Sequence, residues 1–211
     1  MTHHTEPGIT VTGLGTSSTA PDVMTVDIGI SVLATTVAES RALAMSRAQG
    51  LIDALKGGGL NDEDIQTARY SIHPEYDHHE GQQRLRGYRV SNDLQVVLRD
   101  LASAGKIIDT AAGAGGDEVT INNVSFSIED QAAARDQARE AAWSDASARA
   151  EHLARLSGGT LGDVVGIVET SGRPPGPGPV PRMALAAADA TPIEAGTTSI
   201  TVSLEVRFAL G

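Results

Sequence analysis

The segment "VMTVDIGISV" (residues 23–32) alternates side chains that avoid water with side chains that tolerate it. One face of the extended chain carries Met24, Val26, Ile28, Ile30 and Val32, and the other carries Thr25, Asp27 and Ser31. A period of two is the repeat of a β-strand, and one apolar face is typical of an antiparallel sheet. The segment therefore predicts a half-buried strand.

The chain that follows predicts further helices and strands in a definite order. Residues 37–56 carry the helical stripe Ala44, Ala48, Leu51 and Leu55, which ends at the glycines 57–59. Residues 65–76 and 85–98 predict a hairpin with a long polar tip, and Asp100 is expected to cap a second helix over 101–111. Residues 119–128 predict a strand with a bulge near Asn122 and Asn123. The order β-α-β-β-α-β over 23–128 is that of a ferredoxin-like unit.

The rest of the chain predicts a long helix and two strands. Residues 130–156 are rich in alanine and end at Gly158 and Gly159. Residues 161–169 are almost continuous Val and Ile, which predicts a central strand, and 200–208 alternate regularly. Near the start, residues 9–13 predict a short strand, and "LGTSSTAPD" (14–22) is interpreted as a turn.

These elements predict an α+β fold, in which an antiparallel sheet carries helices on one face and leaves a polar face open. We expect a single domain over residues 1–211, with two possible lobes. One lobe would comprise residues 22–128, and the other 8–21 together with 129–211. A proline-rich loop is expected within residues 171–195.

Composition and charge exclude several classes of function. The net charge of −11 disfavours binding to nucleic acid, which requires a basic surface. No run of about 20 apolar residues is present to span a bilayer. The chain has no cysteine, which excludes disulfides and thiolate chemistry. Because the N-terminus lacks a signal-peptide pattern, we expect a cytoplasmic protein, or a periplasmic one if a signal was removed.

The hairpin tip is the strongest candidate for a metal site. It contains His73, Glu75, Asp77, His78, His79 and Glu80. Imidazole and carboxylate groups suit zinc, so His73, His78 and His79 are the candidate ligands. However, a polar loop lacks the rigid scaffold that a precise site needs. We therefore favour a solvated tip and keep metal binding as the alternative.

No catalytic or cofactor site is predicted. Serines are frequent, but the G-x-S-x-G pattern of an activated serine is absent, and His152 is expected on a helix surface. The glycine-rich segments "GLGTSS" and "GAGG" lack the lysine of a phosphate-binding loop.

Several segments together resemble the SIMPL-domain family of bacterial proteins. They are "ITVTGLGTSSTAPDVMTVDIGI" (9–30), "GYRVSNDLQVVLRD" (87–100), "INNVSFSIEDQ" (121–131), "AREAAWSDASARAEHLARLSGGTLGDVVGI" (138–167) and "PIEAGTTSITVSLEVRF" (192–208). The resemblance implies an α+β fold, large homo-oligomers, and a role in stress protection or protein interaction. It implies no catalytic residues.

The expected function is therefore non-enzymatic self-assembly into a ring or cage. Strand edges and the apolar residues 183–188 would supply subunit contacts. The proline-rich run 173–182 could bind a protein partner. The alternatives are a metal-binding protein or metal-dependent hydrolase that uses the His73–His79 region, and a module that binds a small molecule.

Overall fold

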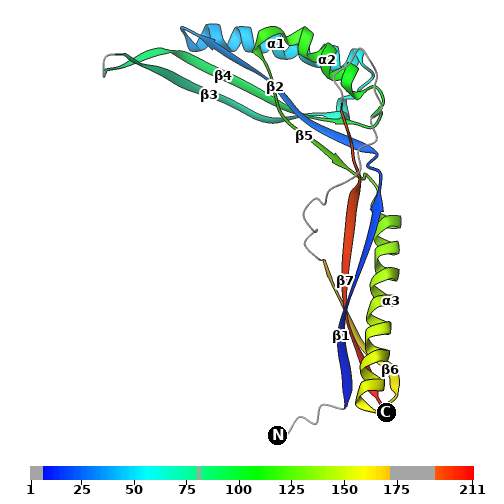
Figure 1. The fold of residues 1–211 in the computed structure, drawn as a ribbon. Helices are drawn as coiled ribbons and strands as arrows, with labels where there is room; N and C mark the ends of the chain where they lie inside the picture. The colour runs from blue at the N-terminus through cyan, green and yellow to red at the C-terminus, as the bar shows by residue number, and fades with distance from the viewer. Residues whose placement is uncertain (1–6, 80–81, 172–192) are drawn as a thin grey trace. The chain divides into compact units, whose positions relative to one another are not determined.

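The computed structural model describes residues 7–79, 82–171 and 193–211 (Figure 1). Contacts within the chain divide the described residues into two compact units. Unit 1 holds residues 7–20, 128–171 and 196–211, and unit 2 holds 21–79, 82–127 and 193–195. Each unit has its own antiparallel sheet, so the predicted α+β class is confirmed.

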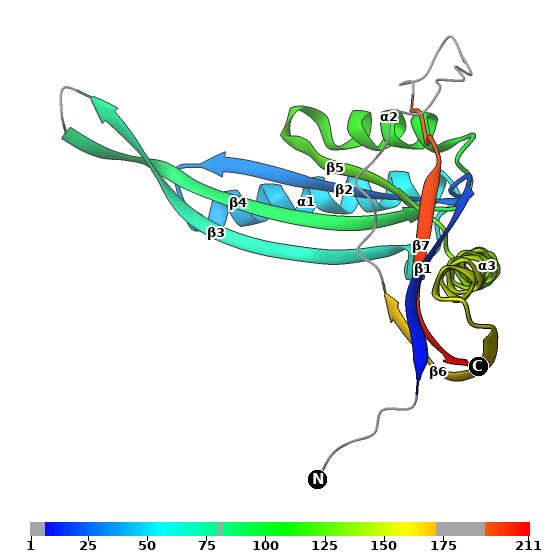
Figure 2. The same cartoon turned by 60° about the horizontal axis from the view of Figure 1, so that its bottom comes forward.

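Unit 2 is a four-stranded antiparallel sheet with the strand order β3-β4-β2-β5. Two helices lie on one face of this sheet (Figure 2). The elements are β2 (Val23–Ala34), α1 (Val37–Gly57), β3 (Ile65–His79), β4 (Gln82–Leu98), α2 (Ala104–Gly115) and β5 (Val119–Ser127), with 3-10 turns at Asp62–Asp64 and Gly116–Glu118. The likeness to a ferredoxin-like unit remains an expectation from the connectivity.

The core of unit 2 forms around β2, which pairs with β4 on one side and β5 on the other. The side chains on the apolar face predicted for β2 are at most 1% exposed: Met24, Val26, Ile28, Ile30 and Val32. The predicted stripe of α1 packs against it, with Ala44, Ala48, Leu51 and Leu55 all buried. The period-two alternation of β2 and the helical stripe of α1 therefore predicted this core correctly.

Local signals set most of the boundaries in unit 2. Thr36 caps α1 by accepting the backbone N–H of Glu39 at 3.2 Å. The second helix begins at Ala104, later than predicted, because Asp100 instead caps the turn before it and accepts the N–H of Ala102 at 3.1 Å. The predicted bulge in β5 is confirmed, since Asn122 is the extra residue opposite β2.

The open face of this sheet is polar, as predicted. Arg69 on β3 donates from Nε to Oδ2 of Asp93 on β4 at 2.9 Å. Arg89 on β4 pairs with Glu75 on β3 and donates to the hydroxyl of Ser31 on β2 at 3.1 Å. Charges of opposite sign on neighbouring strands thus pair with each other across the sheet.

Unit 1 is a three-stranded antiparallel sheet with the strand order β1-β7-β6 and one long helix. Its elements are β1 (Gly8–Thr19), α3 (Ala132–Ser157), β6 (Leu161–Ser171) and β7 (Thr198–Leu210). The helix ends at Gly158, which adopts the left-handed conformation with φ of 77°, as the sequence predicted.

Helix α3 lies against β1 and β7 through a seam of small residues. Every fourth residue of the helix is a buried alanine: Ala134, Ala138, Ala142, Ala146, Ala150 and Ala154. Opposite them, a Cβ added at Gly13 would lie 2.1 Å from the carbonyl oxygen of Ala142, and one at Gly15 would lie 2.0 Å from that of Ala138. The helix backbone therefore rests directly on the backbone of β1.

This seam explains why the predicted extent of β1 was wrong. The sequence pattern predicts a strand that ends at Gly13 and a turn over residues 14–22, whereas β1 continues in register with β7 to Thr19. Gly13 and Gly15 serve the close approach of the helix, a role that glycine can take within a strand.

Side chains of α3 also bind the free edge of β1. Asp145 accepts the backbone N–H of Leu14 at 2.9 Å through Oδ2. Arg149 donates from Nη1 to the carbonyl oxygen of Thr12 at 3.1 Å and from Nε to Asp145 at 3.0 Å. Two backbone groups that an edge strand would leave open are thus satisfied within the chain.

The prediction that residues 161–169 form a central strand was wrong. Among the described strands, β6 pairs only with β7 and forms the other edge of the sheet. The helix covers β1 and β7 and makes little contact with β6. The Val and Ile residues that suggested a buried strand therefore lie at the surface.

We predict that Gly13→Ala destabilises unit 1 by about 1–3 kcal/mol, because the added methyl group forces α3 away from β1. Trp143 is the only tryptophan and lies on α3, so its fluorescence during urea unfolding reports on this unit. Gly166→Ala on β6 of the same unit is the matched control: an added Cβ there meets nothing within 4 Å, and the unfolding midpoint should be unchanged or slightly raised. Equal unfolding midpoints for Gly13→Ala and wild type would contradict the direct packing of α3 on the backbone of β1.

We also predict that the stability of unit 1 depends on pH through Asp145. The amide of Leu14, and then Arg149, lower the pKa of this carboxyl below its ordinary value. Its contribution to stability is therefore present above about pH 4, its unfolded pKa, and is lost as the pH falls through the folded pKa. Asp145→Asn, which keeps an acceptor oxygen, should lose less stability than wild type between pH 6 and pH 3 in the same fluorescence assay. Glu151 is an exposed carboxylate of the same helix, and Glu151→Gln should show the wild-type pH dependence. An unchanged pH dependence in Asp145→Asn would refute the contribution of Asp145 to stability.

Candidate functional site

The histidine-rich hairpin does not assemble a metal site among its described residues. His73 lies opposite Arg89 on the open face of the sheet, and His78 lies opposite Gln83 near the tip. The side chain of His79 and the whole of Glu80 fall outside the described residues. In the part of the chain that the structure describes, no three histidine or carboxylate groups are close enough to share an ion.

Glu75, the carboxylate on the same face as His73, is already occupied. It pairs with Arg89, whose hydrogen bond lowers the pKa of Glu75 and raises the pKa of Arg89 itself. The two opposite charges hold each other in the ionised form. This pair ties β3 to β4 and leaves Glu75 ill-suited to bind a cation.

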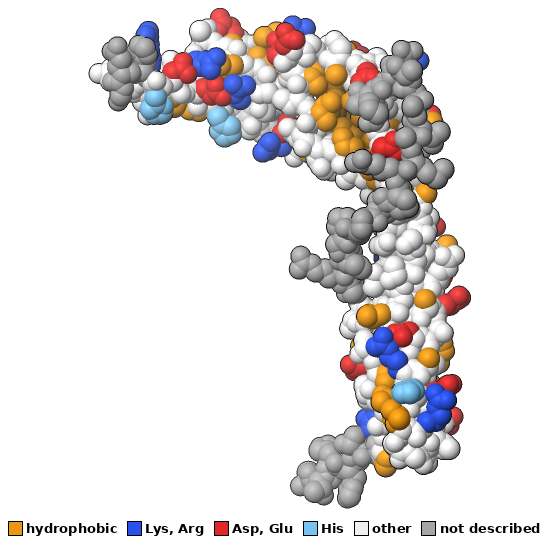
Figure 3. All heavy atoms as spheres, in the orientation of Figure 1, with side chains coloured by type: hydrophobic (Ala, Val, Ile, Leu, Met, Phe, Trp, Pro, Cys, Tyr) orange, Lys and Arg blue, Asp and Glu red, His pale blue; other side chains and the backbone are white. Residues whose placement is uncertain are grey.

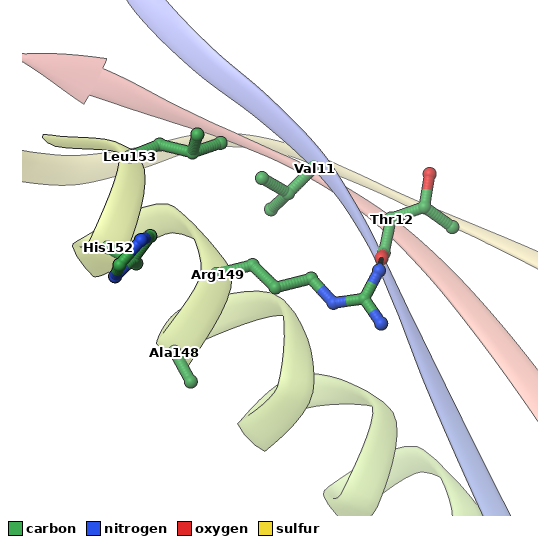
Figure 4. A pocket seen from close by; sticks show the side chains of 6 residues that line it. All are labelled: Val11, Thr12, Ala148, Arg149, His152 and Leu153. Atoms are coloured by element: carbon green, nitrogen blue, oxygen red, sulfur yellow. Dashed lines mark hydrogen bonds between the residues drawn. The ribbon is translucent and has the colours of Figure 1, made fainter. Parts of the chain in front are cut away.

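An open hollow of about 530 Å³ lies on unit 1 between α3 and β1 (Figure 4). It is lined by Val11, Thr12, Ala148, Arg149, His152 and Leu153. The side chain of Arg149 extends from the helix towards β1, where its guanidinium binds Asp145 and the carbonyl oxygen of Thr12. His152 lies on the exposed side of α3, as predicted. The hollow is mainly apolar, and the guanidinium of Arg149 is already bound within the chain. The lining residues therefore offer no set of reactive groups.

The basic residues of the hairpin do not form a surface for nucleic acid. Arg89 pairs with Glu75, and Arg86 lies 4.0 Å from Asp77. With a net charge of −11, the chain lacks the excess of basic groups that phosphate binding requires. Among the described helices, none has the length and apolar character needed to cross a bilayer.

The exposed apolar surface of β6 is the most unusual feature among the described residues. Val164, Val165, Ile167 and Val168 are 41%, 56%, 53% and 55% exposed. Ile167 lies opposite Val206, on the face that α3 shares, while Val168 lies opposite Glu205 on the other face. Both faces of the strand are therefore apolar and open to solvent. Hydrophobic side chains are visible at the surface of this unit in Figure 3.

The other edge strands carry features that obstruct pairing, whereas residues 166–171 of β6 contain no proline and no register shift. β1 is bound by side chains of α3. β3 carries Pro74 and two register shifts, and β5 carries two asparagines at its bulge. Prolines, bulges and polar residues are the usual means of blunting a sheet edge. The register shifts of β6 lie before Gly166, and residues 166–171 pair regularly with β7.

The residues at this edge of the sheet were not predicted as a site. The signal was present in the sequence, as an uncharged run "VVGIV" at 164–168, but it was interpreted as evidence of burial. The other predicted contact segments, residues 173–182 and 183–188, lie outside the described residues.

The chain is similar to known bacterial proteins over nearly its whole length. The 26 kDa periplasmic immunogenic protein of Brucella melitensis is 34% identical over 98% of this chain and 86% of its own length. The uncharacterized protein YggE of Escherichia coli is 31% identical over 91% of this chain and 76% of its own length.

These relatives correct one expectation and confirm another. The predicted cytoplasmic location is contradicted, because the Brucella relatives are named periplasmic proteins. The prediction rested only on the missing signal pattern at the N-terminus. The predicted resemblance is confirmed: residues 9–208 match the SIMPL profile, described as a protein of unknown function (DUF541), and the chain belongs to the SIMPL family.

Proposed function

We propose that this protein is a non-enzymatic, self-assembling SIMPL protein that functions as a homo-oligomer in the periplasm. The observation that carries the proposal is the exposed edge of β6, where four Val and Ile side chains are about half open to water. In a monomer these apolar side chains stay in water, whereas an assembly buries them and pairs the free backbone groups of the edge.

The electrostatics of the described residues support a structural role. Five carboxyl groups have a displaced pKa, and in each the pKa is lowered by a hydrogen bond from a neighbouring group: Glu39, Asp64, Glu75, Asp100 and Asp145. Asp64, for example, accepts the amide of Asn61 at 2.9 Å and pairs with Arg99. A general acid needs the opposite shift, a raised pKa. These carboxylates act as caps and ion-pair partners.

The biological role that we propose is protection of the cell under stress or interaction with other proteins. The names of the Brucella relatives support a periplasmic location. Because the chain has no cysteine, an oxidising compartment imposes no disulfide pairing on it. The proline-rich sequence 173–182, repeated on every subunit of an oligomer, would give avidity for a protein partner.

The test is the mass in solution. We expect size-exclusion chromatography with light scattering to give a multiple of the 21.8 kDa chain mass that persists on dilution into the low micromolar range. Electron micrographs of the same sample should show particles of uniform size. A mass of one chain at every concentration would refute self-assembly.

A further inference from the structure

The regular part of β6 offers one open edge for another strand. Residues 166–171 pair without a register shift to residues 202–207 of β7, so their other side faces outward. At about 3.3 Å per residue, this edge is roughly 20 Å long. Gly166, at its start, has nothing within 4 Å of its Cβ position, so the backbone there is accessible.

The opposite edge of the same sheet, β1, is closed at Thr12 and Leu14 by side chains of α3. Asp145 and Arg149 of α3 already bind the outward backbone groups of Leu14 and Thr12 on β1. A second copy that joined β6 through its own β1 would have to break these hydrogen bonds. Among the described residues, β6 is therefore the edge of this sheet that an added strand can pair with without breaking these hydrogen bonds. Two copies satisfy both of these edges by meeting edge to edge.

We propose that β6 pairs with β6 of a second copy in an antiparallel, twofold arrangement that joins two three-stranded sheets into one of six strands. This inference rests on the proposed function and names its interface. Twofold contacts use the same surface on both subunits and close on themselves. The dimer is then the building unit, and any larger particle requires a different contact between dimers.

The charges on β6 restrict the register of this pairing. In a twofold antiparallel pair, one residue lies opposite its own copy. Centring on Gly166 would place Asp163 opposite Glu169, and like charges directly opposite are destabilising. Centring on Ile167 puts Ser171 opposite Asp163 and Val165 opposite Glu169, and centring on Val168 puts Ile167 opposite Glu169. Arg139 of α3 also binds both carboxylate oxygens of Glu169, at 2.9 and 3.2 Å, and neutralises it.

A stable dimer needs more buried surface than the edge of β6 alone. A standard interface buries roughly 800 Å² on each partner, more than one strand of this length supplies. On the β6 side of α3, Trp143 packs against Phe208 of β7 and is still 38% exposed. Val164 lies opposite Phe208 and Ile167 lies opposite Val206 on this face of the sheet. The incoming copy would cover these two side chains together with Trp143.

Single cysteines test the pairing directly, because the chain has none of its own. We would make Ile167→Cys and Val168→Cys, oxidise them mildly at concentrations where the wild type is oligomeric, and run non-reducing gels. Residues opposite their own copies lie about 4.5–5.5 Å apart between Cα atoms, within disulfide range. At least one variant should cross-link to dimers. Leu14→Cys, 54% exposed on the closed edge, is the control for chance collisions and should cross-link many times more slowly.

A second variant tests the energetics. Val168→Lys places a charge opposite or beside its copy, and we expect its dimer dissociation constant to rise at least tenfold, while Leu14→Lys keeps the wild-type mass. Trp143 fluorescence and circular dichroism would verify folding. If the wild type is oligomeric but neither cysteine variant cross-links faster than Leu14→Cys, or Val168→Lys keeps the wild-type affinity, the β6 pairing is refuted and self-assembly stands. A monomeric wild type would refute both.

Discussion

The approach of α3 to β1 is the contact on which unit 1 depends. Alanine at every fourth helix position meets Gly13 and Gly15, so two backbones pack with almost no side chain between them. A helix is about 10 Å across and strands lie about 4.8 Å apart, so one helix drawn this close covers about two strands. The third strand, β6, is left without a cover.

The same geometry separates a closed edge from an open one. Residues that precede the buried alanines, such as Asp145 and Arg149, reach over β1 and bind its backbone. Residues that follow them, such as Arg139 and Trp143, face the other side and meet β6 and β7 by side chains alone. The asymmetry of one helix thus decides which edge of the sheet can bind another strand. In unit 2, cross-strand ion pairs between β3 and β4 occupy the open face.

Much of the fold could be predicted because the signals were local. The alternation in β2, the stripe of α1, the bulge at Asn122 and the left-handed Gly158 depend on neighbouring residues only. The failures had long-range causes. The segment that contains Gly15 suggested a turn because the partners of Gly13 and Gly15 are more than 120 residues away in α3. "VVGIV" suggested a buried strand because hydrophobicity reports that a segment avoids water, not what covers it.

The sequence by itself determined the class of fold, the family, the core of unit 2 and the lack of a recognisable catalytic motif, because periodicity and composition encode which side chains avoid water. Only the tertiary structure decided the order of strands, the division into two sheets and the place of β6 at an edge. It also showed that Glu75 is bound to Arg89. These features depend on which distant segments meet, and a linear pattern carries no record of partners that approach each other only when the chain folds.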